Sequence, residues 1–239
     1  VEKLPNGEAV MSSFVGGFYR YEEGKDLYSM YLPKWHGVNP DNGEGLFVKD
    51  PSKPAEGDNL TSNYNDPDLQ RTIVAKAYPD VSGSWTNSLS YKGLTLSMML
   101  TYQFGGNLYD YWGYFARSDG RRVWSGWNQA RDIVGNYWKQ SGDVVDNPRP
   151  STRANNTDLA SSRWVKSSDF IRLKEISLSY SLPKKWTDGI GIGGIDVTVS
   201  ANNLAYIYAA TKDIELEVPL NGFRSVDTPL SRTFTVGVN

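Results

Sequence analysis

Cysteine is absent from this chain of 239 residues, histidine occurs once, and apolar residues never form a long run. Without cysteine, a disulfide scaffold and a thiolate metal site are excluded, and a single imidazole (His36) is a poor basis for a zinc site. The apolar runs are far shorter than the ~20 residues of a transmembrane helix. An excess of charge of one sign is missing too, because 25 Lys and Arg are balanced by 27 Asp and Glu. This balance offers no basic face for nucleic acid, so we expect no nucleic-acid partner.

Aromatic residues, by contrast, are abundant. They make up 13% of the chain, with 15 Tyr and 8 Trp, while hydrophobic residues reach only 39%. Disordered chains are poor in aromatics, so we expect a folded protein. Its hydrophobic content lies below that of an ordinary soluble domain.

The clearest local pattern is a β-hairpin built by residues 84–91 and 94–104 around Lys92-Gly93. Both runs alternate with a period of two, as strands do. Glycine supplies the positive φ that a two-residue turn requires, and such a turn fixes the register. The predicted cross-strand pairs are Tyr91 with Leu94, Leu89 with Leu96, Asn87 with Met98 and Trp85 with Leu100 on a mostly apolar face, and Ser90 with Thr95, Ser88 with Ser97, Thr86 with Met99 and Ser84 with Thr101 on a polar face.

Similar alternation or aromatic-rich runs of strand length recur along the chain and predict an all-β protein. About seven strands are expected, at 12–21, 27–35, 84–91, 94–104, 168–181, 194–204 and 231–239. Several approach the ~9–11 residues with which a tilted strand crosses a bilayer. The connections between them alternate between short and long. Long loops of this kind are uncommon in compact soluble domains, whereas outer-membrane barrels combine short periplasmic turns with long extracellular loops.

We therefore predict an antiparallel transmembrane β-barrel segment with long extracellular loops and with Lys92-Gly93 on the periplasmic side. Strands that face lipid on one side and a polar lumen on the other also explain the low hydrophobic content, and aromatics belong at the two membrane interfaces. Seven strands cannot close such a barrel, and an open edge in lipid would leave backbone groups unsatisfied. Together with an alternating run that reaches Asn239, this suggests a fragment. A soluble β-sandwich alternates as well, so periodicity alone leaves that alternative open.

Four segments carry recognisable motifs in a fixed order: residues 35–43 (W-x-G-V-N-P-x-N-G), 79–93 (P-x-x-x-G-x-x-x-N-x-x-x-Y-K-G), 170–183 (F-x-R-L-K-x-I-x-L-x-Y-x-L-P) and 200–204 (S-A-x-N-L). Each resembles the corresponding segment of the SusC/RagA-type TonB-dependent outer-membrane transporters. One departure is the end of the chain, because family members usually finish on a terminal aromatic and this chain finishes on Asn239.

The resemblance implies that residues 1–239 are the C-terminal part of a 22-stranded barrel whose plug and N-terminal domains are not in this chain. It implies active import of nutrients, most often oligosaccharides or else peptides, in the bacterial outer membrane. The implied partners are a SusD-like surface lipoprotein, TonB acting through the missing N-terminal part, the glycan or peptide ligand, outer-membrane lipid and the rest of the barrel.

The connection from 105 to 167 holds the candidate contact residues, chosen because tryptophan rings stack on sugars and arginine donates to hydroxyls or carboxylates. They are Trp112, Trp124, Trp127, Trp138, Arg121 and Arg122, in a segment that also contains Trp164, Arg117 and Arg131. The alternatives are a small loop core and contact with the partner lipoprotein, since tryptophan also dominates interface hot spots. Helical spacing between 124 and 138 suggests a helical turn or two.

Catalytic signatures are missing. The sequence has no G-x-S-x-G elbow, P-loop or G-x-G-x-x-G, so we expect neither an enzyme nor a cofactor. Glu215 and Glu217 fit a glycosidase pair only formally, and a solvated loop face is the preferred interpretation. Asn39, Asp41 and Glu44 fail the EF-hand spacing and predict an Asx turn rather than a metal site. A soluble all-β carbohydrate-binding module remains the alternative function.

Overall fold

The computed structural model describes residues 9–11, 18–151, 157–187, 189, 191, 193–225 and 228–239. The chain divides into two compact units. One, here called the loop unit, consists of Val1–Tyr78, Asn107–Lys166 and Val218–Asp227. The other, the sheet unit, consists of Pro79–Gly106, Ser167–Glu217 and Thr228–Asn239.

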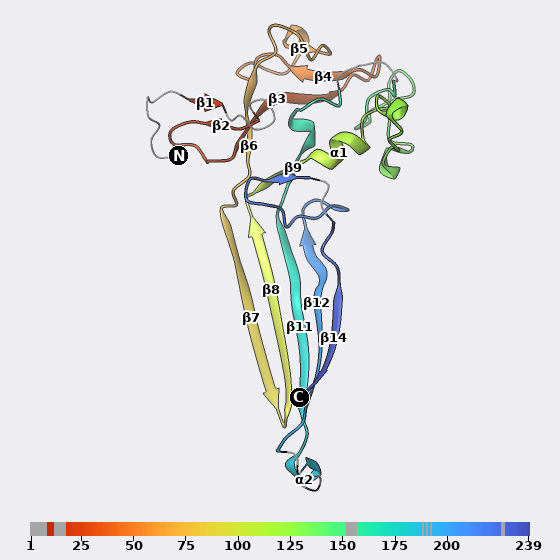
Figure 1. The fold of residues 1–239 in the computed structure, drawn as a ribbon. Helices are drawn as coiled ribbons and strands as arrows, with labels where there is room; N and C mark the ends of the chain where they lie inside the picture. The colour runs from red at the N-terminus through yellow and green to blue at the C-terminus, as the bar shows by residue number, and fades with distance from the viewer. Residues whose placement is uncertain are drawn as a thin grey trace. The chain divides into compact units, whose positions relative to one another are not determined.

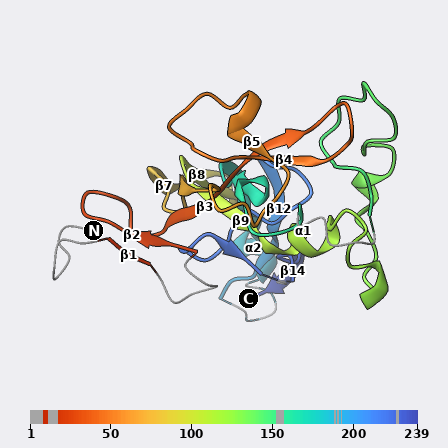
Figure 2. The same ribbon diagram turned by 90° about the horizontal axis from the view of Figure 1, so that it is seen from above.

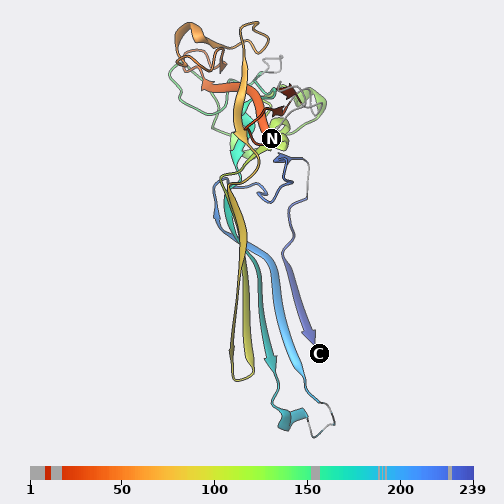
Figure 3. The same cartoon turned by 90° about the vertical axis from the view of Figure 1, so that its left-hand side faces the viewer.

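The sheet unit contains one antiparallel sheet of five long strands in the order β14-β12-β11-β8-β7. The strands lie side by side in both Figure 1 and Figure 3. Their bounds are Val81–Tyr91 for β7, Leu94–Phe104 for β8, Phe170–Ser181 for β11, Asp196–Ala209 for β12 and Thr233–Val238 for β14.

The predicted hairpin is confirmed residue for residue. Tyr91 pairs with Leu94, Trp85 with Leu100, and every predicted pair between them is present. Lys92 and Gly93 have φ values of 47° and 83°. A two-residue turn with two positive φ angles matches the twist of the flanking strands, which is why glycine is favoured in it.

The two faces of this sheet differ in chemistry. On one face of the sheet the side chains are mostly apolar. Many of them are exposed, for example Leu89 at 64% and Phe234 at 70%. This face includes Trp85, Leu94, Leu96, Leu178, Val199, Val236 and Val238. The opposite face carries mainly serine and threonine, with hydrogen-bonded cross-strand pairs such as Ser88 with Ser97 and Ser179 with Thr198. An uncovered apolar face of this extent suits an apolar medium and not water.

All long connections leave the sheet at one end. Val81 pairs with Phe104, Gln103 with Phe170, and Phe170 with Ala209, so β7 and β11 start where β8 and β12 finish. At the other end the connections are the Lys92-Gly93 turn and residues 182–195, which include the short helix α2 (Lys184–Thr187).

A β-bulge interrupts β11 near its start. The register shifts between Leu173 and Glu175 against both neighbouring strands: Lys174 is the extra residue against β8, whereas against β12 two residues, Asn203 and Leu204, lie opposite it. Bulges of this kind redirect side chains. Here the bulge follows Arg172, whose surroundings are described below.

The loop unit is built from short strands. A four-stranded sheet has the order β5-β4-β3-β6, and two smaller sheets are β10-β9-β13 and β1-β2. Figure 2 shows this unit from above, with β4 between β3 and β5. The bounds are Val10–Met11 for β1, Arg20–Tyr21 for β2, Ser29–Val38 for β3, Gly45–Val48 for β4, Leu60–Thr61 for β5, Arg71–Lys76 for β6, Asn107–Asp110 for β9, Val165–Ser167 for β10 and Phe223–Arg224 for β13.

Helical segments of the loop unit are short. They are α1 (Tyr111–Ala116) and the 3-10 turns η2 (Gly57–Asn59), η3 (Val123–Ser125), η4 (Arg131–Ile133) and η5 (Ser162–Trp164). The turns η3 and η4 confirm that this segment contains a helical turn or two, as the spacing between residues 124 and 138 predicted. In the described part of the chain, no helix is long and apolar enough to cross a membrane.

The core of the loop unit is largely aromatic. Phe18 packs edge-on against Tyr19 and Tyr109, each at 4.7 Å between ring centroids, and the Tyr19 hydroxyl donates to the Asn221 carbonyl at 2.6 Å. The buried members are Phe18, Tyr19, Met30, Leu32, Ala77, Tyr109 and Trp164. Segments from the start, middle and end of the chain therefore meet in one core.

Two of the seven predicted strands do not belong to the sheet unit. Residues 27–35 do form a strand, β3, but it pairs with β4 and β6 in the loop unit. Met30 is 0% and Leu32 1% exposed, and their neighbours Ser29 and Pro33 are buried as well. The predicted strand is therefore confirmed, but its expected place among the membrane-crossing strands is wrong, because residues 29–33 are largely buried on both faces. Of the predicted strand 12–21, residues 12–17 lie outside the described residues, and only Arg20–Tyr21 are a strand.

Candidate functional site

The helix α1 carries the first candidate tryptophan, and a buried carboxylate fixes its start. Asp110, 1% exposed, accepts a hydrogen bond from the Gly113 amide at 3.0 Å. The same carboxylate pairs with Arg117 at 3.4 Å and with Arg224 at 2.5 Å. A buried charge is tolerated only when paired in this way, so Asp110 ties α1 to strand β13.

An aromatic ridge extends from α1 to η3; we use this name for Trp112, Tyr114, Phe115, Arg122 and Trp127. Trp127 stacks on Phe115 with 5.2 Å between ring centroids, and Trp112 meets Trp127 edge-on at 5.5 Å. The Arg122 guanidinium lies over Phe115 at 4.3 Å and over Tyr114 at 4.7 Å. Stacked rings and a cation over their faces make one continuous surface.

The outer edge of this ridge is open. Trp127 is 37% exposed, and Trp124, on η3 beside it, is 81% exposed. Contiguous exposed apolar surface of this kind, as distinct from single exposed side chains, is typical of interaction sites. These two indoles are therefore available to a ligand or a partner.

The two candidate arginines share one buried counter-ion. Asp158 is 0% exposed; it accepts from Arg121 Nη1 at 2.7 Å and lies 3.4 Å from Arg122 Nε. Holding Arg122 in this way keeps its plane on the aromatic rings. Burial raises the pKa of Tyr114 above its ordinary value, so its hydroxyl stays protonated at neutral pH.

The remaining candidate indole, Trp138, lies elsewhere in the loop unit and is only 9% exposed. Its Nε1 donates to the Pro40 carbonyl at 2.8 Å, and its ring lies against the backbone of Gly43. Trp164, 2% exposed, likewise donates to the Leu159 carbonyl at 3.1 Å. The structure thus brings Trp112, Trp127 and Arg122 together, places Arg121 and Trp124 beside them, and separates off Trp138.

The segment around Gly43 forms the predicted Asx turns. The Asp41 amide donates to Asn39 Oδ1 at 2.9 Å, and the Glu44 amide donates to Asn42 Oδ1 at 3.0 Å. The side-chain oxygens are therefore engaged by the backbone of their own turn, which agrees with the structural interpretation of this motif.

A polar cavity of about 430 Å³ opens in the loop unit. The pKa of Asp50 is lowered to about 2, because Ser52 donates to its carboxylate from both its hydroxyl and its amide. The cavity combines cations, carboxylates and amides, which suits a ligand rich in hydroxyl or amide groups: it is lined by Lys49, Asp50, Lys53, Asp58, Asn59, Asp68 and Gln70.

A charge cluster lies on the polar face of the sheet unit. Arg172, 4% exposed, pairs with Glu215 Oε2 and with Glu217 Oε1, both at 2.9 Å. Lys174, the bulge residue, donates to Glu217 Oε2 at 2.7 Å. The Arg172 guanidinium also lies 4.0 Å from the centre of the Tyr206 ring. The segment after β12 is thus fastened onto the strands.

Burial by itself would raise the pKa of Glu215, but its hydrogen bonds from Tyr206, the Glu217 amide and Arg172 outweigh this and hold the pKa below its ordinary value. The Leu216 and Glu217 amides both donate to Glu215 Oε1 at 3.0 Å. Leu216, between the two glutamates, is 0% exposed.

Sequence reasoning missed this cluster. A solvated loop face for Glu215 and Glu217 was the wrong interpretation, because their side chains are only 14% and 24% exposed. The available signal was complementary spacing: two cations two residues apart in a strand, and two carboxylates two residues apart further on. With both carboxylates held by cations, the glycosidase interpretation gains no support.

The chain is similar in sequence to known bacterial receptors. No family model matches the chain. TonB-dependent receptor P3 of Formosa agariphila is 26% identical over 99% of this chain, and TonB-dependent receptor P39 of the same organism is 29% identical over 56% of it. The chain spans only 22% and 13% of the length of these two relatives.

Solved structures share the fold. The RagAB peptide transporter aligns over 96% of this chain with a TM-score of 0.77 at 23% identity. The RagAB peptide importer in its open-open state aligns over 99% with a TM-score of 0.78 at 24% identity. In both cases the alignment covers 24% of the solved chain.

A sheet with one uncovered apolar face, one polar face and long connections at a single end has the features of strands in an outer-membrane β-barrel. The chain is similar to TonB-dependent receptors, which are proteins of the bacterial outer membrane, and it shares the fold of RagAB; both findings agree with the SusC/RagA-type resemblance that its motifs carry. The five-stranded sheet described here is not closed into a barrel by itself.

Proposed function

We propose that the protein of which this chain is a part imports oligosaccharides or peptides actively across the outer membrane, driven through TonB. The observation that carries the proposal is the aromatic ridge, with Trp124 and Trp127 exposed on the connection between β8 and β11. In the proposed orientation the long connections face the outside and the Lys92-Gly93 turn faces the periplasm, as in other outer-membrane barrels.

The chemistry of the ridge suits both ligand classes. Indole rings stack on the apolar faces of sugars and on peptide side chains, and they contribute large contact area with few rotatable bonds. Arg122 lies at the inner edge of the same surface, over Phe115 and Tyr114. The RagAB structures are described as a peptide transporter, which supports peptides, whereas the stacked rings support glycans equally well.

A SusD-like surface lipoprotein is the proposed partner on the outer side. Trp124 is 81% exposed, and tryptophan is enriched among interface hot spots, which supports contact with this partner. We assign Trp124 to the partner or ligand, Trp112 and Trp127 to ligand stacking, and Arg121 and Trp138 to holding the loop unit in shape.

The charge cluster is proposed to line the lumen, because it lies on the polar face of the sheet. The alternative function, a soluble carbohydrate-binding module, is not supported: the apolar face of the sheet is exposed, and the curated relatives are TonB-dependent receptors.

The test is uptake by the full-length receptor in its host. Strains carrying the wild-type receptor, Trp127→Ala, or Tyr78→Ala as a matched loss of an exposed aromatic side chain outside the ridge are supplied with labelled oligosaccharides or labelled peptides. We expect Trp127→Ala to reduce uptake of one class about tenfold or more, since hot-spot residues contribute at least ~2 kcal/mol. Uptake of both classes at wild-type levels by Trp127→Ala, with equal amounts of folded receptor, would contradict the assignment. Uptake that persists without TonB would contradict the mechanism.

A further inference from the structure

The short-turn end of the sheet gathers aromatic and basic side chains that the transport function does not use. Tyr91 pairs with Leu94, and Leu94 pairs with Tyr180, so these three residues form a row across the end of the apolar face. Tyr91 is 70% exposed and Tyr180 37%. This row marks the level at which the lipid-facing surface ends, where aromatic side chains favour the headgroup region.

Two neighbouring turns bring lysines to this row. The Lys92 ammonium lies 5.1 Å from the centre of the Tyr91 ring, and both residues are exposed. The Ser181 amide donates to the Gly93 carbonyl at 2.8 Å, which fastens the hairpin turn to the end of β11. Three residues beyond Ser181 the helix α2 begins with Lys184 and Lys185, both exposed.

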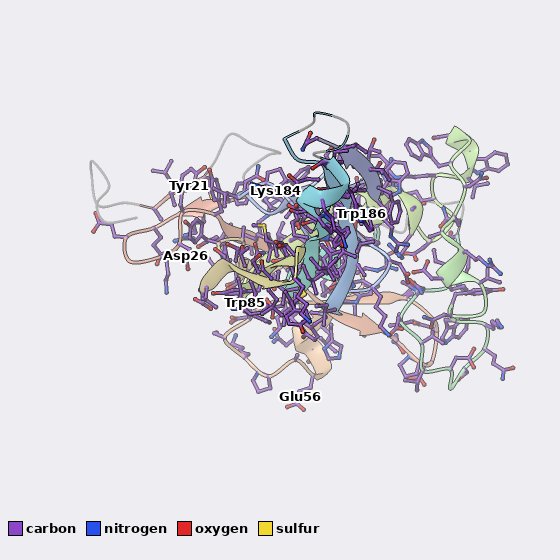
Figure 4. All side chains as sticks on the ribbon, turned by 90° about the horizontal axis from the view of Figure 1, so that it is seen from below. Tyr21, Asp26, Glu56, Trp85, Lys184 and Trp186 are labelled. Carbon is purple, nitrogen blue, oxygen red and sulfur yellow. The ribbon has the colours of Figure 1, made fainter. Side chains whose placement is uncertain are left out.

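An exposed indole completes the group. Trp186 on α2 is 59% exposed, and Figure 4, a view from below in which Lys184 and Trp186 are labelled, shows the two together on this short helix. The nearby carboxylate of Asp196 accepts from the Ser181 hydroxyl, and this pair follows the polar face of the sheet. The Asp196 carboxylate therefore lies on the opposite face of the sheet from the lipid-facing row.

We propose that Lys92, Lys184 and Lys185, with Tyr91, Tyr180 and Trp186, bind the headgroup phosphate of an anionic phospholipid at the membrane boundary. Long lysine side chains extend along apolar surface and place the ammonium at headgroup level, and amphipathic rings belong at the same level. In the proposed orientation this row contacts the bilayer, and the three lysines beside it complement an anionic headgroup. The inference depends on the membrane location of the sheet and not on the transported substrate.

The experiment uses the full-length receptor, purified in neutral detergent and titrated with phosphatidylglycerol, with phosphatidylcholine or with inorganic phosphate, while native mass spectrometry counts bound lipid. Wild-type protein is compared with Lys92→Gln/Lys184→Gln/Lys185→Gln and with a matched triple variant, Lys34→Gln/Lys139→Gln/Lys212→Gln, which removes three exposed lysines that lie outside the proposed site. Resistance of the folded barrel to unfolding in SDS before heating verifies that each variant is folded.

We expect phosphatidylglycerol binding to weaken about fivefold for each of the three lysines that is replaced, with phosphatidylcholine binding unchanged. Trp186→Ala should weaken the binding of both lipids equally, because the indole interacts with the membrane interface and not with the headgroup charge. Equal losses in the two triple variants, or no loss in the first, would overturn the proposal. So would inorganic phosphate competing as well as the lipid does, because the site would then take a free anion.

Discussion

Arg172 and Glu215 form a 2.9 Å ion pair that joins the polar face of strand β11 to the segment following β12. The arginine side chain is 5% and the glutamate side chain 14% exposed, so the pair is shielded from water and from salt. Both charges also have further partners: Arg172 reaches Glu217, and Glu215 accepts from Tyr206. This pair determines where residues 210–217 lie on the sheet.

Glu215→Gln should release that segment. Removing one charge of a shielded pair leaves Arg172 partly uncompensated, and such changes cost about 3 kcal/mol or more. The measurement is trypsin cleavage after the exposed Lys212 in the folded full-length receptor. We expect faster cleavage in Glu215→Gln and wild-type cleavage in Glu56→Gln, which removes an exposed carboxylate from the loop unit. Unchanged cleavage in Glu215→Gln would show that the pair does not hold the segment.

The same carboxylate predicts a pH dependence. The pKa of Glu215 in the folded protein lies below its ordinary value of 4.5. Its contribution to stability is therefore complete above pH 4.5 and is lost as the pH falls through the lower, folded-state pKa. Hydrogen exchange of the Leu216 and Glu217 amides, corrected for intrinsic rates, should accelerate only in that acidic window. In Glu215→Gln the acceleration should be absent, and an equal one would assign the effect to another group.

Leu96→Arg should block assembly of the barrel. Leu96 pairs with Leu89 and with Leu178 in the middle of the apolar face. An arginine at the middle of the bilayer costs about 2–4 kcal/mol when it faces lipid. The control is Ser97→Arg, one residue along the strand and on the polar face. The readout is the fraction of heat-modifiable receptor in the outer membrane, and equal loss in both variants would argue against a lipid-facing assignment of Leu96.

Gly43→Ala should disturb the packing of Trp138. Gly43 has a φ of +75°, and a Cβ there would collide with the Trp138 ring. Gly24 has the same φ of +75° with open space around its Cβ position, so Gly24→Ala isolates the backbone cost of about 1 kcal/mol. Proteolysis of the connection that contains Trp138 should increase in Gly43→Ala beyond the effect of Gly24→Ala. Equal effects would show that contact with the indole adds nothing.

Local chemistry explains why much of the sheet was predictable. Alternation in β7 and β8, with Lys92-Gly93 between them, specifies the register, since a slip of one residue would exchange the lipid-facing and polar faces. The same alternation located β11, β12 and β14. The candidate indoles were predictable as residue types, but their division into exposed Trp124 and Trp127 and buried Trp138 was not, because burial depends on distant partners such as Pro40.

The sequence by itself determined the five strands of the sheet unit, the hairpin register and the family resemblance, because these depend on residue period, turn chemistry and contiguous motifs. Only the tertiary structure decided that Ser29–Val38 belongs to the loop unit, since it pairs there with β4 and β6 and packs Met30 and Leu32 against the distant Tyr109 and Trp164. Only the tertiary structure brought Arg172 and Lys174 to Glu215 and Glu217, because long-range ion pairs follow from the path of the chain and not from local pattern.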